Sequence, residues 1–311
     1  SGFIMVWSAK DSDTVGDFYL RRFAKIYPTH CLTWAIAFII GAISIYQYKL
    51  WSSNLLLLNT WFDDVRYFFV GNRPSWSLCI EAMFYLSFPF LFRIMKAIPE
   101  KYDFLGLIAV TAASFLVQMS IYSWVEPNKM MGAFPISQHH FWMSYIFPPA
   151  RIFEFLAGMF AARLLINGRE IMLPKITSLA LLVATYIGSM YIPFQFSMSV
   201  VFIIPVCLLI TSLAGDDLKT RKTVFNHNTS VWLGEISYAF YMVHFLVLFY
   251  FLNLTAGRKF DLVEGGGLIA VTLILSIACA SFVYKYFEVP MMKIILVKFR
   301  TKKLISIRES S

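Results

Sequence analysis

The stretch SWSLCIEAMFYLSFPF, residues 75–90, places one carboxylate, Glu81, in a run of mostly apolar residues. The run belongs to an apolar block over residues 76–96, and an α-helix needs about 20 such residues to cross the hydrocarbon core of a bilayer. Because lipid offers the backbone no hydrogen-bond partners, a spanning segment of this kind folds as a helix. The stretch therefore predicts a membrane-spanning helix that carries an ionisable group.

The rest of the chain repeats this pattern, since 59% of its 311 residues are hydrophobic and only 14% are charged. Soluble domains have about a quarter of their residues charged, and the mean hydropathy here is +0.66. We predict an all-α fold, a polytopic transmembrane helix bundle that forms a single domain over residues 1–311. Eight complete spans are expected, at residues 25–46, 76–96, 102–124, 146–167, 173–192, 196–214, 233–254 and 265–288.

The first residues, SGFIMVW at positions 1–7, are apolar but too few to cross a bilayer. We expect them to be the end of a partial N-terminal helix that begins upstream. They do not resemble a signal peptide, which needs a basic segment before its apolar core.

Basic residues divide unevenly between the two sides of the predicted bundle. If the spans alternate, 20 of the 27 Lys and Arg residues fall on the side that holds residues 8–25. Positive charge collects on the cytoplasmic side, so we predict a multi-pass protein of the bacterial inner membrane with a cytoplasmic C-terminus. Topology then explains the net charge of +9, and no nucleic-acid partner is expected. The basic cytoplasmic tail, residues 289–311, is expected to meet the anionic headgroups of membrane lipids.

Ionisable side chains near mid-span cost about 2.5–3.5 kcal/mol each and usually face the bundle interior or a water-filled cavity. Glu81 is followed at helical spacing by Phe84, Tyr85 and Phe88. The carboxylate therefore shares a helix face with aromatic rings, which form either a binding wall or a packing seam.

In the stretch PPARIFEFLAG, Arg151 and Glu154 lie three residues apart, so they share one helical face. An intrahelical ion pair is one interpretation, and a clamp for an anionic or oxyanionic group is the other. Gly158 follows on the same face and would let a neighbouring helix approach closely.

Two further stretches carry polar residues at unusual places. In GEISYAFYMVHF, the side chains of Ser237, Tyr241 and His244 accompany Glu235, and Tyr241 is the expected neighbour of His244. RRFAKIYP, residues 21–28, places Arg21, Arg22 and Lys25 at the cytoplasmic mouth of a span. That cluster is either a topological anchor or a phosphate clamp.

Other kinds of site leave no pattern in the sequence. The four cysteines stand singly in apolar segments, so we expect small buried hydrophobic residues and neither disulfides nor metal ligands. His139 and His140 form a pair in an outer loop without further ligand spacing, and both are expected to be surface residues.

Taken in order, these stretches resemble the acyltransferase 3 family of integral membrane acyltransferases. The resemblance covers essentially the whole chain and has several ordered blocks. They are SGFIMVW, FYLRRFAKIYP, SWSLCIEAMFYLSFPF, RIFEFLAG, GEISYAFYMVH and YKYFEVP.

The resemblance implies a parent of about ten spans, of which this domain lacks the first helix. It implies transfer of an acyl group, often acetyl, from an acyl-coenzyme A co-substrate to a hydroxyl of a cell-surface glycan, exopolysaccharide or lipid-linked saccharide. Arg21, Arg22 and Lys25 would bind coenzyme A, and Arg151 and Glu154 would be catalytic. The acceptor path would be lined or supported by Glu81, Tyr85, Ser237, Tyr241 and His244. No metal is implied.

Two departures from the family pattern matter. The family carries its catalytic His on the first helix, so this chain is expected to lack the base and to be inactive or much weakened alone. His30 does not match that motif. Lys25 stands where the family has an Arg, and a Lys keeps the charge but loses the bidentate fork.

Two other classes of protein remain open at this stage. A transporter of a saccharide or small anion would also place charges in an interior cavity, although its usual inverted repeats and discontinuous helices are not detected in the sequence. A purely structural scaffold would explain the spans but not the ordered polar blocks.

Overall fold

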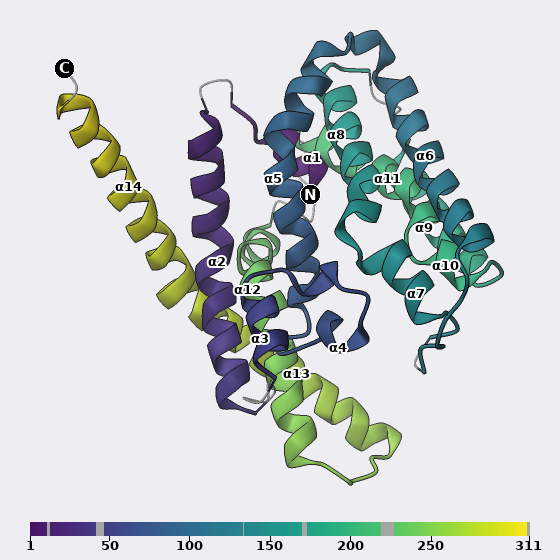
Figure 1. Ribbon diagram of the computed structural model, residues 1–311, viewed down its shortest axis with the longest axis vertical. Helices are drawn as coiled ribbons and strands as arrows, with labels where there is room; N and C mark the ends of the chain where they lie inside the picture. Colours follow the sequence, from purple (N-terminus) through teal and green to yellow (C-terminus); the bar gives the residue numbers. More distant parts are fainter. Residues whose placement is uncertain (11–12, 42–46, 133, 170–172, 219–226, 310–311) are drawn as a thin grey trace. The chain divides into compact units, whose positions relative to one another are not determined.

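The structure is a computed structural model that describes residues 1–10, 13–41, 47–132, 134–169, 173–218 and 227–309, with side chains described as far as residue 299. Every regular element in these ranges is a helix or helical turn (Figure 1). The one strand-like feature there is an isolated antiparallel bridge between Met130 and Ser137. The predicted all-α class is therefore confirmed for the described residues.

Within the described residues, five helical segments are long and apolar enough to cross a membrane. They contain α5 (Ser75–Ala97), α6 (Asp103–Trp124), α11 (Ile203–Leu218), α12 (Asn228–Leu254) and the run from α13 (Leu262–Val283) into α14 (Val289–Glu309). The predicted spans at 146–167 and 173–192 contain α8 (Ile152–Ile166) and α9 (Lys175–Ser189). The predicted span at 25–46 only overlaps α2 (Val15–Ile39), which begins ten residues earlier, and residues 42–46 lie outside the described residues. The shorter helices include α1 (Gly2–Trp7), α3 (Tyr48–Leu55), α4 (Val65–Phe68), α7 (Gln138–Phe141) and α10 (Phe194–Ser197).

The chain forms two compact units, which we describe separately. The first consists of residues 1–12, 60–68 and 77–223, and the second of residues 13–59, 69–76 and 224–311.

Close backbone contact joins α1 to α8 in the first unit. A Cβ atom added to Gly2 would lie 2.0 Å from the carbonyl oxygen of Phe155, and one added to Gly158 would lie 2.9 Å from the backbone nitrogen of Phe3. Only glycine fits at both places, since the atoms in the way belong to backbone. The close approach predicted at Gly158 is confirmed, and it fixes the start of α8, where Arg151 and Glu154 lie.

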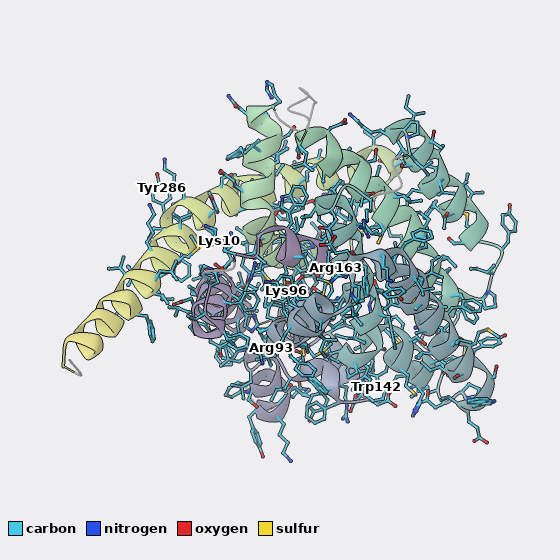
Figure 2. The ribbon with its side chains drawn as sticks, turned by 90° about the horizontal axis from the view of Figure 1, so that it is seen from above. Lys10, Arg93, Lys96, Trp142, Arg163 and Tyr286 are labelled. Atoms are coloured by element: carbon cyan, nitrogen blue, oxygen red, sulfur yellow. The ribbon has the colours of Figure 1, made fainter. Side chains whose placement is uncertain are left out.

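A buried ion pair ties α8 to the turn between α5 and α6. Arg163 is 9% exposed, and its guanidinium donates to the Asp103 carboxylate and to the carbonyl oxygens of Met95 and Ile98. Figure 2 labels Arg163 among the packed helices. Each of its three nitrogens therefore has an acceptor, as a buried charge requires.

In the second unit, α12 and α13 pack through small apolar residues. Ala239 and Val243 of α12 meet Ala280 and Val283 of α13. Figure 1 shows α2 beside α14, a contact within the same unit.

A buried polar network holds α3 against α2 in the second unit. The Nε2 atom of His30 lies 3.1 Å and 3.3 Å from the carbonyl oxygens of Asn54 and Leu55. The Asn54 amide donates to the carbonyl oxygen of Val70 and to the hydroxyl of Ser75. His30 is fully buried and binds backbone, so its role here is structural.

The cysteine prediction is correct in part. All four cysteines are free thiols, and Cys79 and Cys207 are buried. Cys31 is half-buried and Cys279 is exposed, because α13 turns many of its side chains outward from the unit, Ile274 and Phe282 among them.

Candidate functional site

A cavity of about 420 Å³ lies in the first unit. One wall is polar and carries Arg151, Glu154 and Ser199. A second wall is apolar and consists of α11 residues that share one helical face. The cavity is lined by Ser1, Gly2, Phe3, Phe84, Arg151, Glu154, Phe155, Gly158, Met198, Ser199, Phe202, Ile203, Val206, Cys207 and Ile210.

Arg151 and Glu154 form the ion pair that their spacing predicts. The Nη2 atom of Arg151 lies 2.6 Å from an oxygen of Glu154, and the side chains are 17% and 23% exposed. The guanidinium also lies over the ring of Tyr145, 4.4 Å from its centroid. The Nη1 atom is buried and has no hydrogen-bond partner among the described residues. A guanidinium in a cavity wall can donate a hydrogen bond to an oxyanion or carbonyl oxygen.

Ser199 joins this polar wall, with its hydroxyl within hydrogen-bond reach of the Glu154 carboxylate. No sequence pattern points to Ser199, because it lies 45 positions from Glu154 in a segment without a motif. Only the packing of α11 and its preceding turn against α8 brings the two together.

Glu81 and Tyr85 interact with each other in the first unit. The Tyr85 phenol donates to the Glu81 carboxylate one turn away, and the Ser1 hydroxyl donates to its other oxygen. Phe84 stacks on Phe155 with ring centroids 4.6 Å apart, and Phe88 meets the same ring edge-on. The aromatic face is therefore a packing seam, and Phe84 also belongs to the cavity wall.

Arg21 and Lys25, near the start of α2, pair with carboxylates of the second unit. Arg21 donates twice to Asp13, at 3.1 Å and 2.6 Å. Lys25 pairs with Glu288, whose side chain is 1% exposed, and lies near the rings of Tyr238 and Tyr284. The Arg22 guanidinium lies 5.3 Å from the ring centroid of Phe18. An incoming phosphate would have to compete with Asp13 and Glu288.

The polar residues of α12 are held mostly by backbone carbonyls. Ser237 donates to the carbonyl oxygen of Gly234, and Tyr241 donates to that of Pro74 at 3.0 Å. The Nδ1 atom of His244 lies 3.2 Å from the carbonyl oxygen of Phe240. Its ring centroid is 5.8 Å from that of Tyr241, so the predicted neighbour of His244 is confirmed.

The two outer-loop histidines differ from each other, and only His140 departs from the predicted surface position. His140 is buried, because its Nε2 atom binds the carbonyl oxygen of Val125 at 2.7 Å. His139 remains partly exposed and pairs with Asp63. The sequence could not reveal that pair, since the two residues lie 76 positions apart without a shared motif.

Apolar helices around a cavity with a charged wall define an integral membrane protein with an interior polar site. The sequence model of the family described as "Acyltransferase domain" matches residues 1–283. The acyltransferase MdmB of Streptomyces mycarofaciens is 32% identical over 307 residues, which cover 95% of this chain and 79% of that protein. No solved structure matches. The chain belongs to this acyltransferase family, so acyl transfer is its activity and the expected resemblance is confirmed.

Proposed function

We propose that the protein transfers an acyl group, acetyl in the simplest case, from acyl-coenzyme A to a hydroxyl of a cell-surface glycan, exopolysaccharide or lipid-linked saccharide. The observation that carries this proposal is the cavity whose polar wall carries Arg151, a guanidinium with one buried nitrogen, Nη1, that has no partner among the described residues. Such a donor is suited to the carbonyl oxygen of a thioester, on which negative charge develops during attack.

In the proposed reaction, the acceptor hydroxyl oxygen attacks the thioester carbonyl carbon while a base removes the hydroxyl proton. The carbon–sulfur bond breaks, an ester forms, and the departing thiolate takes up a proton. Arg151 stabilises the oxyanion, and Glu154 and Ser199 orient its guanidinium. The family resemblance implies a His in the role of the base.

Apolar side chains near Arg151 suit the acyl group itself. Ile203, Val206 and Ile210 of α11 line the cavity together with Cys207. A water-poor wall of this kind strengthens the electrostatic contribution of Arg151 and disfavours hydrolysis of the thioester.

The cations of α2 are proposed to bind the phosphates of coenzyme A. Arg21 and Lys25 have side chains 37% and 38% exposed, so a polyanion can reach them and displace their carboxylate partners. Glu81, Tyr85, Ser237, Tyr241 and His244 support the helices or the acceptor path.

The proposed topology has eight spans in the bacterial inner membrane, with the C-terminus and the start of α2 on the cytoplasmic side. It rests on the division of basic residues and on described helices that overlap each of the eight predicted ranges. The segments over residues 47–75 and 125–145 then lie on the outer side, and α14 carries the basic tail along anionic lipid.

The test measures turnover of radiolabelled acetyl-coenzyme A in proteoliposomes, with the protein expressed from its complete reading frame. Arg151→Ala should lower transfer at least about 100-fold, the usual effect of removing an oxyanion donor, with unchanged membrane expression. Arg258→Ala is the matched control, since Arg258 is an exposed arginine paired with Glu264 in the second unit. Unchanged activity in Arg151→Ala would reduce Arg151 to a packing ion pair.

A further inference from the structure

Asp63 and His139 form a carboxylate–imidazole pair in the first unit. The Nδ1 atom of His139 lies 2.7 Å from an oxygen of Asp63, and the side chains are 38% and 22% exposed. Asp63 lies just before α4, and His139 belongs to α7. The pair is separate from the lining of the cavity that holds Arg151.

Neighbouring groups fix the backbone of both members of this pair. The Gln138 amide donates to the backbone oxygen of Asp63 at 3.2 Å, and the backbone N–H of His139 donates to the Asn128 side chain at 2.8 Å. With Nδ1 on the carboxylate, Nε2 has no partner among the described residues. A histidine fixed in this way presents Nε2 as a hydrogen-bonding group for a hydroxyl.

Aromatic rings continue the surface beside this pair. The rings of His139 and Trp142 have centroids 6.3 Å apart, Trp142 and Phe147 are 4.7 Å apart, and Phe147 meets Trp61 edge-on at 5.6 Å. Trp142, labelled in Figure 2, is fixed by its indole N–H, which donates to the carbonyl oxygen of Thr60 at 3.0 Å. Trp61 is 41% exposed, so part of its indole is accessible to a ligand.

A π-helical turn, Trp142–Ile146, connects this surface to the polar cavity wall. Trp142 begins the turn next to His139, and Tyr145 near its end lies under the Arg151 guanidinium. Single π-helical turns are uncommon and frequent at functional sites. A ligand on the aromatic surface would thus be coupled through one short segment to the proposed reacting group.

We propose that Asp63, His139, Trp61 and Trp142 form a binding site for the saccharide acceptor, with a sugar hydroxyl on Nε2 of His139 and a sugar ring face on the open indole of Trp61. A saccharide fits because it combines apolar ring faces with many hydroxyls, and the site combines flat apolar rings with a fixed polar pair. The inference rests on the proposed function for the acceptor class and for the outer position of these loops.

The test is saturation-transfer NMR of two neutral probes, maltotriose and chitotriose, on the full chain in nanodiscs. It needs no turnover, so it is independent of the thioester donor. At least one probe should bind saturably. His139→Asn keeps a donor for Asp63 but removes Nε2, and it should weaken binding about three- to ten-fold, the range expected for one hydrogen bond. Trp61→Ala should weaken binding about ten-fold or more.

Two neighbouring residues provide matched controls. Asp64→Asn alters the adjacent carboxylate, which pairs with Arg66, and Trp124→Ala removes an indole that is 83% exposed. Both variants should bind the probe as the unmodified chain does.

The outcomes separate this inference from the proposed function. Saturable binding that is lost in the site variants, with no consumption of acetyl-coenzyme A, would reject the donor and keep the site. Failure of both probes to bind would overturn the site, whatever the thioester turnover. Equal weakening by site and control variants, as for Trp residues that only anchor the protein at a lipid interface, would overturn it too.

Discussion

Arg151 and Arg163 lie 12 residues apart at the two ends of one segment, yet their surroundings differ. All three nitrogens of Arg163 donate to acceptors, and the side chain is nearly buried. Arg151 pairs with Glu154 but keeps one buried nitrogen unpartnered among the described residues, beside a cavity. A buried charge whose hydrogen-bond donors all have partners holds helices together. A buried charge with an unused donor is available for a ligand. Variants of both residues test this distinction.

Arg163→Met should have the largest effect on stability. Removing one partner of a buried pair leaves Asp103 uncompensated and costs about 3–5 kcal/mol. We expect little folded protein, measured as the midpoint of unfolding in a detergent titration. Adding Asp103→Leu removes the unpaired charge and should recover much of the loss. If Arg163→Met alone were as stable as the unmodified chain, the structural role that distinguishes Arg163 from Arg151 would be wrong.

Gly158→Leu should be the next most damaging substitution. The new side chain would meet the backbone of Phe3, and overpacking of this kind costs about 1–3 kcal/mol. The same unfolding titration measures it, with Gly188→Leu as control, because a Cβ at Gly188 meets nothing within 4 Å. Equal losses at both glycines would contradict the close packing of α1 on α8.

Arg151→Lys should change rate rather than stability. Lysine keeps the charge but loses the planar fork that reaches Glu154 and the cavity together. We expect transfer to fall about ten-fold or more, which corresponds to about 1.4 kcal/mol in the activation free energy, with an unchanged unfolding midpoint. If the free energy of unfolding fell by as much as the activation free energy rose, Arg151 would be a structural residue like Arg163.

Glu81→Gln should have the smallest effect, about 0.5–1.5 kcal/mol of stability, because it weakens one half-buried hydrogen bond with Tyr85. Tyr85→Phe removes the same bond from the other side. The double variant should therefore cost less than the sum of the two single changes. Strict additivity would show that the contact contributes nothing, and full transfer activity in Glu81→Gln would leave the residue a structural role only.

Much of the fold follows from the sequence because each span must satisfy its own backbone in lipid. Apolar block length then predicts helices directly, and α5, α6, α11 and α12 formed close to the expected ranges. The Arg151–Glu154 pair was also accessible, since a three-residue spacing fixes a shared helical face. The role of Gly158 could be predicted as well, because a glycine on that helical face indicates the close approach of a neighbouring helix.

The partners across the chain were not accessible in this way. The sequence showed Arg163 only as one of many basic residues near a span end, and Asp103 lies 60 positions away. It gave no reason to join Ser199 to Glu154 or His139 to Asp63, because such contacts depend on how helices and loops pack and leave no periodicity behind.

By itself, the sequence determined the membrane class, the helical fold, the acyltransferase family and the charged residues that lipid makes costly to bury. The tertiary structure decided which of those charges are saturated, as at Arg163, and which retain an unused donor, as at Arg151. The physical reason is that burial cost depends on local composition, which a sequence displays, whereas hydrogen-bond satisfaction depends on distant segments that only folding brings together.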